Sequence, residues 1–148
     1  MTLAQITGGV ASTSTHLNSS MTQLPLFGFS VTVTGSISFT KFIVPTSFTT
    51  QTYLANAKLY RNATNTYPSS PQQVGTVTLT STAVEISFST AETINNTTGY
   101  YFIVADVAYS GTSTDTYAPF IFSYSKTFGE STSGNYAAHS SDSRNYTY

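Results

Sequence analysis

The sequence of 148 residues contains no cysteine and no tryptophan, and only 7% of its residues are charged. The absence of cysteine excludes disulfide bonds, thiolate metal sites and a cysteine nucleophile. A typical soluble domain has about 25% charged residues, so this chain has few charges with which to hold a charged partner. Its five lysine and arginine residues are scattered along the chain. They cannot form the basic face that nucleic-acid binding requires, nor a polybasic membrane anchor.

The sequence also lacks a membrane span and a leader. No apolar run is long enough to cross a bilayer, and Met1–Val10 has neither the basic start nor the apolar core of a signal peptide. Threonine and serine are abundant instead, with 28 and 22 residues. Solubility therefore depends on hydroxyl groups rather than ions, which is typical of secreted and surface β-proteins. We expect an extracellular or cell-surface protein whose leader is not part of this sequence.

The most apolar stretch is Gly99–Ala108, GYYFIVADVA, which is rich in aromatic and β-branched residues. A run this short and this apolar predicts a strand that is covered on both faces, in the middle of a sheet. Leu24–Thr34 alternates instead, with Phe27, Phe29, Val31 and Val33 on one face and serine and threonine on the other. This period of two predicts a strand with one buried face.

Further strands are predicted on both sides of these two. In Ile37–Val44, Lys41 falls in phase with the apolar residues, so we expect either a sheet edge where it snorkels or a bulge that resets the register. Pro45 is expected to end that strand. Thr2–Ser14 alternates weakly around Gly8 and Gly9 and predicts a bent or bulged edge strand. The remaining predicted strands are Gln51–Arg61, Val74–Thr80, Val84–Ser89 and Tyr117–Ser125. The polar connections are Thr15–Gln23, Asn62–Gln73, Thr90–Thr98 and Ser110–Asp115.

Short strands at regular spacing without a helical period predict an all-β fold, specifically an Ig-like antiparallel β-sandwich of about seven or eight strands. An up-and-down barrel is the alternative, but a stretch that is apolar on both faces favours the sandwich. We expect one sandwich domain over residues 1–126. Residues 127–148 are expected to be a polar tail of serine, asparagine and tyrosine that acts as a linker or an exchanged segment.

Several short blocks of the chain together form a pattern that is shared with other proteins. The blocks in the second half of the pattern are Ala57–Arg61 (AKLYR), Gly75–Val77 (GTV), Glu85–Phe88 (EISF), Ile94–Thr98 (INNTT) and Tyr100–Ala108 (YYFIVADVA). With them, the chain resembles a module that recurs in secreted proteins of Bacteroidetes. Upstream, Gly9–Thr13 and Phe27–Val33 are similar to the first two strands of that module, and the similarity extends over residues 5–125.

The resemblance implies an Ig-like repeat of a surface protein, in adhesin-like chains or beside secreted enzymes, with a structural or binding role. The module has no catalytic set to transfer to this chain. Phe102 and Val104 stand where its members often have tryptophan or tyrosine. The resemblance therefore does not imply a surface aromatic platform for sugar at these two positions.

No catalytic or metal-binding motif is present. His16 and His139 lie in a connection and in the tail, so we expect solvent-exposed histidines rather than metal ligands or members of a catalytic triad. Glu85 and Glu92 could form the carboxylate pair of a glycosidase only if they faced one cleft.

Asp106 interrupts an apolar strand, and a buried carboxylate needs hydrogen-bond partners. We expect it to cap the end of the strand, bonding amides of Ser110–Thr114. Calcium binding by Asp106 together with Asp115 is the weaker alternative, and no other cofactor is expected.

Tyrosines supply the best candidates for ligand or partner contact, because a tyrosine can combine a buried ring with an exposed hydroxyl. The candidates are Tyr60, Tyr67, Tyr109 and Tyr117. We therefore expect no enzyme but a structural or adhesion module of a bacterial surface protein, in contact with other copies or neighbouring modules and with glycans. The alternatives are a surface-filament subunit that assembles by strand exchange and a carbohydrate-binding appendage of a secreted enzyme.

Overall fold

A computed structural model describes residues 1–11, 21–48, 54–79, 83–108, 120–123, 127–131, 134–137 and 143–146. Within these ranges every regular element is a strand, and no helix is long and apolar enough to cross a membrane. The expected all-β class is therefore confirmed. The strands are β1 (Thr2–Ile6), β2 (Leu24–Thr32), β3 (Ser36–Phe48), β4 (Leu54–Asn62), β5 (Gln72–Leu79), β6 (Ala83–Asn95), β7 (Thr98–Val107), β8 (Phe120–Ser123), β9 (Thr127–Ser131), β10 (Gly134–Ala137) and β11 (Ser143–Tyr146).

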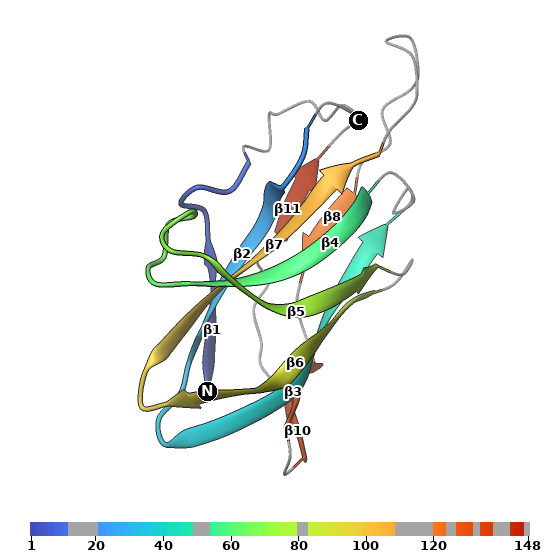
Figure 1. Cartoon of the computed structure of the whole chain (residues 1–148). Helices are drawn as coiled ribbons and strands as arrows, with labels where there is room; N and C mark the ends of the chain where they lie inside the picture. The colour runs from blue at the N-terminus through green and yellow to red at the C-terminus, as the bar shows by residue number, and fades with distance from the viewer. Residues whose placement is uncertain are drawn as a thin grey trace, which may run out of the picture.

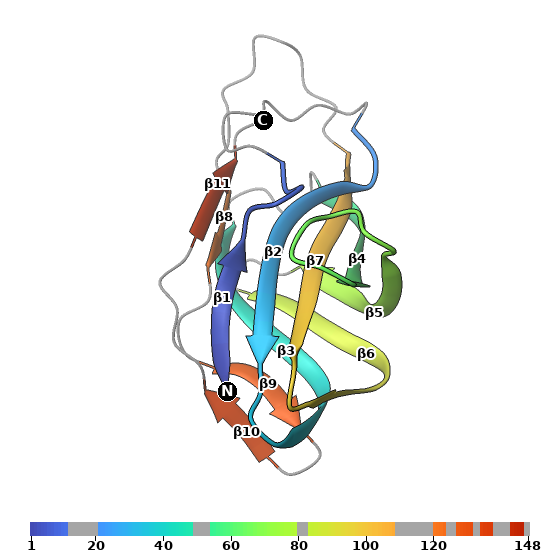
Figure 2. The same ribbon diagram turned by 90° about the vertical axis from the view of Figure 1, so that its left-hand side faces the viewer.

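Seven strands form one curled antiparallel sheet in the order β1-β2-β7-β4-β5-β6-β3 (Figures 1 and 2). The hydrogen-bonded path is continuous, because β5 pairs with β4 on one side and with β6 on the other. The far edge of β3 is covered by β9 near its start and by β8 near its end. Strand β10 pairs with β9, and β11 pairs with β8.

The main core lies inside the curl, where β2 and β7 meet β3 and β6. The Phe42 ring from β3 lies 5.8 Å from Phe29 of β2 and 5.7 Å from Tyr101 of β7, measured between centroids. The alternation predicted for β2 is confirmed, since its apolar face is buried and Thr32 is exposed. The buried residues of that face are Phe27, Phe29, Val31 and Val33.

Strand β7 is covered on both faces, as predicted. On its outer face, Phe102 and Val104 form a second small cluster with Ile6 of β1. The segment between β4 and β5 lies over this face (Figure 2), and the Tyr67 ring sits 5.3 Å from that of Phe102. Backbone contacts between Gly8 and residues Thr66 and Tyr67 join this segment to the end of β1. The cover therefore combines two parts of the chain that are distant in sequence.

The awkward phase of Lys41 is resolved by a bulge, one of the two predicted explanations. The register of β3 against β6 shifts between Phe39 and Lys41, so that both Phe39 and Phe42 are buried. The Lys41 ammonium instead forms an ion pair of 2.8 Å with Glu85 of β6.

Two predicted boundaries are wrong. Pro45 does not end its strand, because β3 continues to Phe48. A proline is tolerated in a strand where no neighbouring strand needs its missing N–H. This is the case at Pro45, since β8 pairs with β3 only from Thr46 onward. The polar stretch after residue 89 is not a connection either, since β6 runs on to Asn95 opposite β3.

Within residues 127–148, expected to be a tail, the structure places β9, β10 and β11. The division into a domain and a tail remains a prediction.

Glycine at position 99 is required by the packing of the core. A Cβ atom added there would lie 2.5 Å from the hydroxyl oxygen of Tyr101, whose side chain is fully buried. We expect Gly99→Ala to lower the free energy of unfolding by about 1–3 kcal/mol, because the ring has little room to shift. Urea unfolding measures the change. Thr97→Ala, in the exposed neighbouring turn, is the control, and equal stability of the two variants would contradict the packing described here.

Candidate functional site

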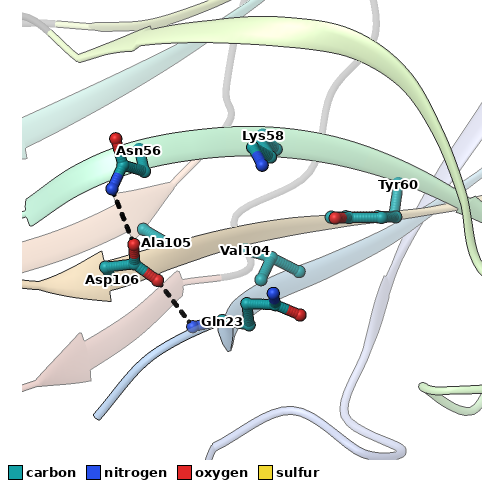
Figure 3. A pocket seen from close by; sticks show the side chains of 7 residues that line it. All are labelled: Gln23, Asn56, Lys58, Tyr60, Val104, Ala105 and Asp106. Atoms are coloured by element: carbon teal, nitrogen blue, oxygen red, sulfur yellow. Dashed lines mark hydrogen bonds between the residues drawn. The ribbon is translucent and has the colours of Figure 1, made fainter. Parts of the chain in front are cut away.

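A small polar pocket opens on the outer face of the sheet, near the end of β7. Its volume is about 120 Å³. Figure 3 shows that β4 and β7 form most of its wall and that the residue before β2 closes one side. The lining residues are Gln23, Asn56, Lys58, Tyr60, Val104, Ala105 and Asp106.

The register between β4 and β7 brings these side chains together. Lys58 is opposite Val104 and Tyr60 is opposite Phe102, so alternate residues of β4 share the outer face with β7. The register shifts between Ala55 and Lys58. This bulge allows Asn56, with a positive φ of 52°, to turn its side chain toward the same face.

Asp106 is the anchored group of the pocket. The backbone N–H of Gln23 donates to its Oδ1 at 2.8 Å, and Asn56 Nδ2 donates to its Oδ2 at 2.7 Å. The hydrogen bond from Asn56, followed by that from Gln23 and by the charge of Lys58, holds the pKa of Asp106 below its usual value. The carboxylate is therefore ionised at neutral pH.

Asp106 thus ties strands together, but through partners other than those expected. The amides of Ser110–Thr114 lie outside the described residues, as does Asp115, the second ligand of the suggested calcium site. In the part of the chain that the structure describes, no three histidine, cysteine, aspartate or glutamate residues gather around a point that could hold a metal. Calcium binding remains a prediction.

Two of the four candidate tyrosines meet beside the pocket. The rings of Tyr60 and Tyr67 lie 6.2 Å apart in an edge-to-face arrangement, and both are half-buried. Burial, and then the neighbouring Tyr60, raise the pKa of Tyr67, so its hydroxyl stays protonated at neutral pH. Tyr109 and Tyr117 lie outside the described residues.

The glutamates considered as a glycosidase pair point in different directions. Ile86 is in the core, so its neighbour Glu85 faces away from it, toward Lys41. Glu92 was expected in a loop but lies on β6, where it is buried. It accepts a hydrogen bond of 2.8 Å from the Tyr101 hydroxyl and forms an ion pair of 3.1 Å with Arg61. Burial and the Glu92 charge raise the pKa of Tyr101.

Sequence reasoning missed three pocket residues, Gln23, Asn56 and Lys58. Asn56 could have been found from the sequence, since a turn-forming residue in the middle of a predicted strand indicates a bulge.

A second, shallower hollow of about 330 Å³ lies on the same face, between β1 and the segment that follows β4. Tyr100 lines it together with Gln5, Ser30 and Thr66.

Comparisons of the chain with models of known families, with curated proteins and with solved structures found no match.

The anchoring of Asp106 predicts a pH-dependent contribution to stability. Its pKa is lower in the folded state than the value of about 3.9 of an unfolded chain, so its contribution is present above that value and is lost as the pH falls through the folded pKa. We expect Asp106→Asn to lower the free energy of unfolding by at most about 1 kcal/mol near neutral pH, because solvent screens this partly exposed site, and by less at the lowest pH below about 3.9 at which the chain still folds. Urea unfolding at both pH values measures this.

The control is Ser89→Ala, an exposed change that should have the same small effect at both pH values. If Asp106→Asn costs as much in acid as at neutral pH, the hydrogen bonds to the carboxylate do not stabilise the fold as described.

Proposed function

We propose that the chain is a non-catalytic structural and adhesion module of a bacterial surface protein. The observation that carries this proposal is the use of the acidic side chains. Each of the three carboxylates whose surroundings are described, Glu85, Glu92 and Asp106, bonds to groups on neighbouring strands. Carboxylates used in this way hold a sheet together, and they are not arranged as an acid and base around a cleft.

These bonds connect most of the curled sheet. Glu85 joins β6 to β3, and Glu92 joins β6 to β4 and β7. Asp106 joins β7 to β4 and to the chain that leads into β2. A module that spaces or presents neighbouring parts of a surface protein needs this kind of stiffness.

The finer architecture that we propose is a β-sandwich in which β2-β7-β4-β5 faces β6-β3. Ring contacts across the core, such as Phe42 with Tyr101, support this packing. The strand order differs from the expected Ig-like one, in which the second strand pairs with the fifth; here β7 lies between β2 and β4. Pairing β2 with β7, β3 with β6 and β4 with β5 is the order of a jelly roll, and we propose that arrangement.

The proposed extracellular location rests on composition. The chain has few charged residues and many with hydroxyl groups, and the sequence blocks listed above resemble modules of secreted Bacteroidetes proteins. Neighbouring modules of the same surface protein are the partners that such a location suggests.

The second candidate is a filament subunit that assembles by strand exchange, and a specific observation favours it. The backbone edge of β3 at Phe39–Phe42 pairs with Glu130 and its neighbours in β9, near the end of the chain. The same edge could accept β9 from another copy, because strand addition uses only backbone hydrogen bonds.

Light scattering over a hundredfold range of concentration distinguishes the two candidates. For a structural module we expect the full chain to have the monomer mass of 15.9 kDa at every concentration. Mass that grows with concentration, and that is lost when the chain is ended after Lys126, would contradict this proposal and favour the filament. Circular dichroism of the shortened chain is the control for its folding.

A further inference from the structure

We infer that the pocket formed by Asp106, Asn56, Lys58, Tyr60 and Gln23 binds one neutral, hydroxyl-rich sugar residue of a glycan. This inference rests on the proposed adhesion function and names the class of ligand that the module would hold. Three properties of the pocket carry it: its balance of charge, its fixed hydrogen-bonding groups and its size.

The charges of the pocket favour a neutral ligand. Asp106 contributes one negative charge and Lys58 one positive charge, and the other lining residues are uncharged. Of the lysine and arginine side chains that the structure describes, Lys41 and Arg61 form ion pairs, whereas Lys58 forms none. The two charges cancel, so neither an acidic nor a cationic ligand gains a net attraction, whereas a neutral molecule with dipolar groups can bond to both.

The hydrogen-bonding groups match neighbouring hydroxyls. Each oxygen of Asp106 accepts one protein N–H and, as a carboxylate oxygen, can accept a second hydrogen. The Lys58 ammonium can only donate. A pair of hydroxyls on adjacent sugar carbons can donate to the carboxylate and accept from the ammonium at once. Figure 3 shows the Tyr60 hydroxyl pointing toward the pocket, where it adds a further donor and acceptor.

The pocket is organised before a ligand arrives. Among the described residues, four that are not glycine have a positive φ, and two of these, Gln23 and Asn56, are the residues that bond to Asp106. A backbone held in this sparsely populated region is often found at ligand sites. The Tyr60 ring is fixed by its contact with Tyr67. Asp106 and Tyr60 therefore lose little side-chain freedom on binding.

The size of the pocket limits the contact to one residue of the glycan. A volume of about 120 Å³ accommodates part of a single sugar ring but not a chain of rings. The half-buried Tyr60 supplies apolar surface for the C–H groups of the ring. The pocket therefore suits a terminal residue or a side branch.

Affinity electrophoresis of the full chain tests the inference. The probes are gels that contain galactan, mannan, xylan or mixed-linkage glucan, with polygalacturonate as the acidic counterpart. We expect at least one neutral polysaccharide to retard the chain and polygalacturonate not to. Lys58→Gln and Tyr60→Ala should each weaken retardation by about tenfold in affinity, the usual effect of losing a central contact.

Matched controls separate this pocket from the rest of the surface. Lys41→Gln removes the same charge on β3, and Tyr100→Ala removes a tyrosine from the second hollow of the same face. Both should bind as the unaltered chain does, and urea unfolding checks that all four variants fold. Binding that survives both pocket substitutions, or that is lost with Tyr100→Ala, would overturn the inference. So would the absence of retardation in every neutral gel, or a change of oligomeric mass in Lys58→Gln and Tyr60→Ala.

A reducing-end assay on the same polysaccharides keeps the two proposals distinguishable. Release of reducing ends would refute the non-catalytic function while supporting a sugar site on this chain. Failure to bind any neutral glycan would overturn the sugar site, whereas the structural function would still be judged by light scattering.

Discussion

Burial of β7 on both faces is the constraint on which the rest of the structure depends. A strand with Tyr101, Phe102, Ile103 and Val104 in succession cannot leave either face in water without losing much of the free energy that its apolar surface contributes. The inner face is covered when the sheet curls and brings β3 and β6 against it. The outer face needs separate cover, which the segment after β4 and the end of β1 provide. The curl of the sheet and the position of the segment after β4 both follow from the burial of β7.

The position of the candidate site follows from where the outer cover stops. The Tyr67 ring covers Phe102 and Val104 is buried beside it, whereas Asp106, farther along the same face, is partly exposed. At this point β4 bulges, and the residues around Asp106 form the wall of the pocket. The strand that organises the core therefore also presents the polar site, and the tyrosine pair marks the border between them.

Much of the fold could be predicted because apolar periodicity is a local property of the sequence. The alternation from Phe27 to Val33, the doubly buried β7 and the irregularity at Lys41 were all readable from spacing alone. The positions of polar residues inside strands could not be predicted from spacing. Glu92 reads as part of a connection until the Tyr101 hydroxyl and Arg61 are known to face it. The strand order that separates one sandwich topology from another also depends on pairings between distant segments, which spacing does not encode.

The candidate site was harder to predict, because it too depends on contacts between distant segments. It stands out in the structure because charged residues are scarce. Asp106 was recognised as unusual, yet its partners lie 83 and 50 positions earlier in the chain. In a protein with so few ions, most described charges pair directly with an opposite charge. Lys58 lies close enough to lower the pKa of Asp106 but forms no ion pair with it. Because Asn56 and Gln23 hold the carboxylate, the two opposite charges stay apart on either side of a pocket. Both groups therefore keep hydrogen-bonding capacity that a direct ion pair would use.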